Sequence, residues 1–133
     1  MAERRTEERS TLLAQARTAS DQLQLGEALA TYERMLEADP DDLVPLLGTV
    51  RVLMRMRRQD EALEAANRAM ARFPEDHRAL AVMGSLQFLM DNNTEAIETL
   101  EQAIELADED TEAHVILAQA LADEGQHDRA DQE

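Results

Sequence analysis

Apolar residues recur along the chain at intervals of three and four positions, the spacing that places them on one face of an α-helix. In residues 27–38 this apolar stripe consists of Ala28, Leu29, Tyr32, Met35 and Leu36. Short polar turns separate one stripe from the next. The pattern therefore predicts an all-α protein, with helices over residues 9–22, 27–38, 43–56, 61–72, 77–90, 95–106 and 111–124.

Residues with known preferences mark the expected helix ends. Pro40 ends the second helix, because proline disfavours helical geometry in the residue before it. Asp60 and Thr94 are the expected N-caps of the fourth and sixth helices. Gly125 is the expected end of the seventh helix. Residues 1–8 are expected to form a polar lead-in that frays.

The predicted helices repeat every 34 residues, the separation of Ala28 from Ala62. The columns aligned at this interval are Ala28/Ala62/Ala96/Ala130, Leu12/Leu46/Leu80/His114, Ala16/Val50/Gly84/Ala118 and Pro40/Pro74/Asp108. A shared register of this kind is typical of a helical repeat array, in which each repeat buries its apolar face against its neighbours. We expect repeats over residues 9–42, 43–76, 77–110 and 111–133, the last of them incomplete.

These columns resemble the tetratricopeptide repeat, a helix pair of about 34 residues with small, aromatic, Ala and Pro positions at fixed places. Matching residues include Gly84, Ala62, Tyr32, Ala69 and Pro74. The departures are Leu or His at the Trp position, Val50 at a small position, Ala66 and Leu100 at an aromatic position, and Asp108 in place of Pro. The resemblance covers about residues 9–133 and implies a right-handed superhelix of antiparallel helix pairs, three repeats complete and one truncated.

The net charge of −16 is distributed unevenly along the chain. Residues 1–90 carry 15 acidic residues and 12 Arg, whereas residues 91–133 carry 14 acidic residues and a single Arg. This distribution argues against nucleic acid or an anionic membrane as the partner of the C-terminal end. The chain has no Cys, no apolar run long enough to insert into a membrane and no apolar core of a signal peptide at its start. We therefore expect a cytoplasmic protein.

The resemblance also implies a concave groove lined by the first helix of each repeat. The residues expected to line it are Leu13, Arg17, Val44, Leu47, Arg51, Met54, Arg55, Arg78, Ala81, Val82, Ser85 and Phe88. Four Arg on one apolar face of an acidic chain predict a partner segment, protein or peptide, that combines carboxylates with apolar residues. The function expected is therefore that of a protein-interaction scaffold or adaptor.

Other interpretations of these residues stay open. In the first interpretation, the apolar groove residues pack between adjacent repeats and the Arg side chains are simply solvated. In the second interpretation, the chain self-assembles into a homo-oligomer through its acidic fourth repeat or its unfinished last helix. In the third interpretation, the chain is a regulatory repeat domain of a larger protein. A sharper family function, the clamp for acidic chaperone tails, is not expected, because of its matching positions Leu13, Arg17, Gly48, Arg78 and Val82 only Arg78 retains a comparable group.

The sequence predicts neither an enzyme nor a cofactor or metal site. No Ser/His/Asp grouping or phosphate-binding loop is present. His77 opens a helix, His114 lies in a core column and His127 is expected in a turn, so no two of them share the spacing of metal ligands. The acidic loop at residues 108–112 lacks the Gly and the distal Glu of a calcium loop.

Overall fold

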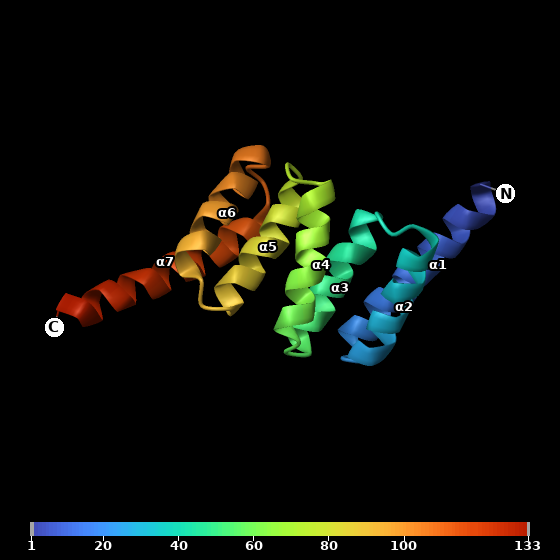
Figure 1. Cartoon of the computed structure of the whole chain (residues 1–133), viewed down its shortest axis with the longest axis horizontal. Coiled ribbons are helices and arrows are strands. Elements are labelled where there is room, and N and C mark those ends of the chain that lie inside the picture. The colour runs from blue at the N-terminus through green and yellow to red at the C-terminus, as the bar shows by residue number, and fades with distance from the viewer. Residues whose placement is uncertain (1, 133) are drawn as a thin grey trace. The chain divides into compact units, whose positions relative to one another are not determined.

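The computed structural model describes the backbone of residues 2–132 and the side chains of residues 6–126. Throughout this backbone the regular structure is helical, which confirms the all-α fold (Figure 1). The helices are α1 (Ala2–Asp21), α2 (Leu25–Ala38), α3 (Leu43–Arg55), α4 (Gln59–Arg72), α5 (His77–Leu89), α6 (Asn93–Leu106) and α7 (Thr111–Gln132). None of these helices is long and apolar enough to cross a membrane.

The chain divides into two compact parts, Met1–Arg72 and Phe73–Glu133, called here the N-terminal and C-terminal parts. In the N-terminal part, α1 pairs with α2 and α3 pairs with α4, while α2 also packs on α3. In the C-terminal part, α5 pairs with α6, and α7 packs against both of them. Short turns join the helices within each pair, so the paired helices run antiparallel (Figure 1).

Small residues stand where the two helices of a pair cross. Ala28, Ala62 and Ala96 are each fully buried, as their shared column predicts. A methyl side chain lets two helix backbones approach closely and leaves no room for a larger residue at the crossing. Ala130, the fourth member of the column, lies outside the residues whose side chains are described.

The turns within the first three helix pairs share one backbone geometry. Leu23, Arg57 and Asp91 occupy the same position in successive repeats and adopt left-handed φ angles of 62°, 61° and 66°. In each turn the next amide donates to a carbonyl five residues earlier, the bond that closes a Schellman motif. These bonds join Gln24 N to Ala19 O at 2.7 Å, Arg58 N to Leu53 O at 2.9 Å and Asn92 N to Gln87 O at 2.8 Å. Because glycine occupies none of these positions, the sequence did not reveal the motif.

Several expected helix ends are wrong. The first helix begins at Ala2, since the charged residues before Arg9 are good helix formers. Helices α4 and α6 begin at Gln59 and Asn93, ahead of their expected caps.

The largest error in the expected helix ends concerns Gly125. Helix α7 continues through Gly125 to Gln132, so that His127 is helical too. Gly125 follows Leu23, Arg57 and Asp91 in the turn column, but residues 126–133 contain no apolar residue besides Ala130. A fold-back at Gly125 would therefore bury little apolar surface.

An Asp column precedes the first helices of successive repeats. Asp76 and Asp110 each accept a backbone N–H from the first turn that follows, at 2.9 Å and 3.0 Å. Asp42 makes no such cap bond, because its carboxylate binds the guanidinium of Arg9 through contacts of 2.7 Å and 3.0 Å. His77 Nδ1 lies 2.7 Å from Asp110 Oδ2. His77 thus joins α5 to the start of α7, and no group of three metal-ligating side chains occurs among the described residues.

Candidate functional site

The structure divides the predicted groove residues by exposure and by part of the chain. The four Arg are exposed, at Arg17, Arg51, Arg55 and Arg78. Four apolar residues are half-buried, namely Leu13, Val44, Met54 and Phe88, and four residues are buried, namely Leu47, Ala81, Val82 and Ser85. Members from α1 and α3 belong to the N-terminal part, and members from α5 belong to the C-terminal part. The two groups are described separately.

In the N-terminal part, Arg17 and Arg51 both act electrostatically on one aromatic side chain. Arg17 lies on α1, Arg51 on α3, and Tyr32 on α2 between them in sequence. Burial raises the pKa of the Tyr32 hydroxyl, and the nearby guanidinium groups of Arg17 and Arg51 act in the opposite direction. Both exposed cations therefore act on the same side chain, while their joint contact with one partner stays a prediction.

The ring of Tyr32 packs closely against Gly48 of α3. A Cβ atom built on Gly48 would lie 2.3 Å from Tyr32 Cζ, so the ring occupies the space beside the α3 backbone. Gly48 is one of the positions matched to the chaperone-tail clamp, and the structure packs it against α2. The available signal was the glycine itself, since a glycine inside a helical pattern often marks a close approach.

Arg55 makes contacts that the sequence did not suggest. Its Nη1 atom lies 3.2 Å from Ser20 Oγ and 3.3 Å from the Ser20 carbonyl oxygen. Ser20 belongs to the last turn of α1, where the helix dipole favours a cation, and its carbonyl oxygen also accepts from the Leu23 amide at 3.0 Å. Arg55 thus ties α3 to the end of α1 while it remains exposed.

Arg78, in the C-terminal part, forms an ion pair within its own helix start. Its Nε and Nη2 atoms lie 3.3 Å and 3.1 Å from the carboxylate of Asp76, which also caps the Arg78 amide. Burial acts to raise the pKa of Asp76, but the hydrogen bonds from Arg78 outweigh it and lower that pKa. The carboxylate in turn raises the pKa of Arg78. Much of the charge that Arg78 would offer a partner is therefore balanced locally.

The other predicted residues of the C-terminal part are mainly internal. Ser85 Oγ donates to the Ala81 carbonyl at 2.9 Å and lies 3.4 Å from Glu112 Oε1 on α7. Val82 is 1% exposed. These residues help to hold α5 against its neighbours. The half-buried Phe88 remains as the apolar member of this set with accessible surface.

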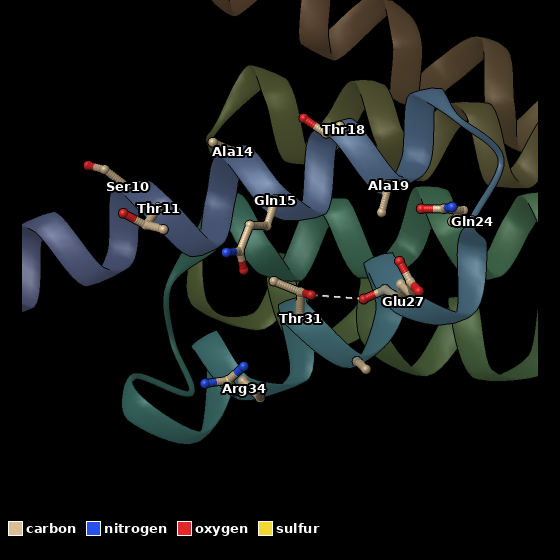
Figure 2. A pocket seen from close by; sticks show the side chains of 11 residues that line it. Ser10, Thr11, Ala14, Gln15, Thr18, Ala19, Gln24, Glu27, Thr31 and Arg34 are labelled. Atoms are coloured by element: carbon tan, nitrogen blue, oxygen red, sulfur yellow. Dashed lines mark hydrogen bonds between the residues drawn. The ribbon is translucent and has the colours of Figure 1, made fainter.

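An open pocket of about 840 Å³ lies between α1 and α2 (Figure 2). Its polar lining includes Thr11, Gln15 and Thr18, and Thr31 Oγ1 donates to the Glu27 carbonyl at 2.8 Å. At the positions equivalent to Thr11, Gln15 and Thr18, the later first helices bury Pro45/Ala79, Thr49/Met83 and Val52/Leu86. The first repeat thus carries polar residues at three positions that the later repeats bury, which suits the solvated outer face of a repeat array.

Comparison with known proteins places the chain among helical repeats. Two tetratricopeptide repeat models match the sequence, one over residues 19–86 and the other over residues 82–131. No curated protein matched the sequence.

Solved structures of tetratricopeptide domains share this fold. The domain of Sgt2 from Aspergillus fumigatus has a TM-score of 0.82 and 19% identity, covering 92% of this chain and 82% of that one. The first domain of human RPAP3 has a TM-score of 0.77 and 24% identity, covering 89% and 95%. The second RPAP3 domain, in complex with the HSP70 peptide SGPTIEEVD, has a TM-score of 0.73 and 15% identity, covering 87% and 97%.

Proposed function

Because the chain belongs to the tetratricopeptide repeat family, we propose that it is a non-catalytic interaction scaffold. Members of this family are typically protein-interaction modules. The partner is a protein or peptide segment that carries both carboxylates and apolar side chains. The observation that carries the proposal is that Arg17 and Arg51, at equivalent positions of successive repeats, are both exposed.

The chemistry of this surface in the N-terminal part fits such a segment. Leu13, Val44 and Met54 are half-buried, so each offers some apolar contact area on α1 or α3. Each guanidinium forms strong charge-assisted hydrogen bonds with carboxylates. Apolar contacts supply most of the affinity, while the cations set the orientation of the segment and its association rate.

Two of the predicted Arg residues have internal partners. Arg55 is engaged with Ser20, and Arg78 is paired with Asp76. A partner carboxylate competes with these internal partners at both residues. Carboxylate binding at Arg55 or Arg78 therefore displaces a contact that the structure already contains.

The HSP70 peptide held by the second RPAP3 domain is also acidic and apolar, with the sequence SGPTIEEVD. This chain lacks most of the residues that hold such chaperone tails. Gly48 packs against Tyr32 and Val82 is buried, so two of the matching positions are unavailable to a ligand. The proposed partner is therefore defined by its acidic and apolar chemistry and not by a chaperone tail.

The test measures binding of fluorescently labelled peptides that alternate Glu or Asp with Leu, Val or Met. We expect Arg17→Ala/Arg51→Ala to weaken binding by about 10- to 100-fold, the loss for one or two charge-assisted contacts. Arg34→Ala is the matched control, because Arg34 is an exposed Arg in the pocket between α1 and α2. Equal affinity of the double variant and the Arg34→Ala variant would remove Arg17 and Arg51 from the binding surface.

A further inference from the structure

Helix α7 exposes a face that the first helix of an earlier repeat buries. On α3 this face consists of Leu46, Val50 and Leu53, which are 1%, 0% and 4% exposed. The equivalent residues of α7, two repeats later, are His114, Ala118 and Leu121. All three are exposed, and the exposed fraction of Leu121 reaches 50%. Leu106 and Val115 add further exposed apolar surface in the same part of the chain.

A close contact in the C-terminal part shows what this face normally meets. Gly84 of α5 lies one repeat before Ala118, and a Cβ atom built on it would lie 2.6 Å from Leu100 of α6. The column of Gly84 and Ala118 therefore faces the second helix of its own repeat. Since α7 runs straight on to Gln132, no second helix covers Ala118 within the described residues.

Helix α4 shows which chemistry fits such a face. It covers α3 with a stripe of small buried residues, Ala62, Ala65, Ala66 and Ala69. Its last turns are anchored by two Arg to the loop before α3. Arg68 Nη2 lies 3.3 Å from the Pro40 carbonyl oxygen, and Arg72 forms an ion pair with Asp41.

The loop before α7, like the loop before α3, carries three acidic residues. Asp108 and Glu109 stand two repeats after Pro40 and Asp41, so a carboxylate replaces the proline of the earlier loop. Both residues are exposed. Residues 91–126 contain 11 acidic residues and no Arg, which adds a negative field around the face.

We propose that this face of α7 binds a helix from a partner protein. The helix packs small residues against His114, Ala118 and Leu121 and places Arg or Lys of its last turn against Asp108 and Glu109. A second copy of this chain is a poor donor, because α2 and α4 are buried in their own pairs and α6 carries no basic residue. This proposal concerns the C-terminal part and does not depend on Arg17 or Arg51.

The probe is a synthetic peptide with the sequence of α4, residues 59–72, acetylated and amidated at its ends. It is titrated into the full 133-residue chain, and amide chemical shifts are followed by NMR. We expect saturable shifts in residues 111–124. Leu121→Glu should weaken binding at least about tenfold. Leu23→Glu, at an exposed leucine of the N-terminal part, is the matched control and should leave the affinity unchanged.

Charge reversal tests the anchor. A peptide with Arg68→Glu/Arg72→Glu should bind the chain at least about tenfold more weakly, and Glu109→Arg in the chain should restore part of that loss. The Arg17→Ala/Arg51→Ala variant should bind the α4 peptide normally, so the two proposals fail separately.

Three results would overturn the proposal. The first is absence of saturable binding of the α4 peptide. The second is binding that ignores both Leu121→Glu and the charge reversals. The third is a concentration-dependent dimer, detected by light scattering without peptide and abolished by Leu121→Glu, because the occupant of the face would then be a second copy.

Discussion

The ring of Tyr32 packs so closely on Gly48 that a Cβ atom at position 48 would lie 2.3 Å from Cζ of the ring. This contact joins α2 of the first repeat to α3 of the second. The pKa of the hydroxyl on the same ring responds to Arg17 and Arg51. The packing between these repeats and the proposed binding surface thus share one side chain.

Replacing Gly48 with Ala should destabilise the fold by about 1–3 kcal/mol, because the added methyl group overpacks a buried ring. Gly26→Ala is the matched control, since Gly26 also lies in a helix but has no atom within 4 Å of the added Cβ. That variant should gain up to about 1 kcal/mol from helix propensity. Urea unfolding followed by circular dichroism measures both, and equal stability of the two variants would contradict the close packing.

The single tyrosine of the chain makes its titration directly visible by tyrosinate absorbance. Burial raises the pKa of Tyr32, so the folded state favours the neutral phenol. The stabilisation is fully present below the unfolded pKa of about 10 and is lost as the pH rises through the folded value. Tyr32→Phe should lack this alkaline loss of stability. Arg17→Ala should raise the pKa further, because it removes a cation that favours the phenolate.

Removing the Asp76 carboxylate should cost about 0.5–2 kcal/mol, the usual value of an N-cap side chain. The folded state lowers the pKa of Asp76, so this stability is present above the unfolded pKa of about 3.9 and is lost as the pH falls through the folded value. Unfolding of Asp76→Ala and wild type should therefore converge at strongly acidic pH. Asp42→Ala is the control, because Asp42 makes no cap bond, and it should cost less than about 1 kcal/mol.

Replacing Gly125 with Ala should stabilise α7 by up to about 1 kcal/mol, since Gly125 lies inside a continuous helix with open space around it. Amide hydrogen exchange over residues 111–132 should then become slower. Faster exchange would mean that Gly125 forms a left-handed turn like Leu23 and Arg57, where Ala would be strained.

The sequence by itself determined the fold class and the repeat register. Ala28, Ala62 and Ala96 are fully buried, because every helix crossing needs a small residue and the same crossing recurs in each repeat. A requirement repeated at a fixed spacing is visible in one sequence. For the same reason, the register alone placed Arg17 and Arg51 at equivalent positions of successive repeats.

Only the tertiary structure decided which sides of the first helices are open. Leu47 and Val82 are buried, Gly48 meets Tyr32, and Arg55 meets Ser20. These contacts depend on how closely neighbouring helices approach and on which rotamer a long side chain adopts. The repeat period specifies neither the approach nor the rotamer.

The course of α7 was also decided by tertiary structure. Gly125 occupies the turn column, yet the helix continues because the residues after it have almost no apolar face to bury in a fold-back. Local preference made a turn possible at this position, and apolar burial was needed to form it. The exposed face of Ala118 and Leu121, on which the second proposal rests, is the consequence.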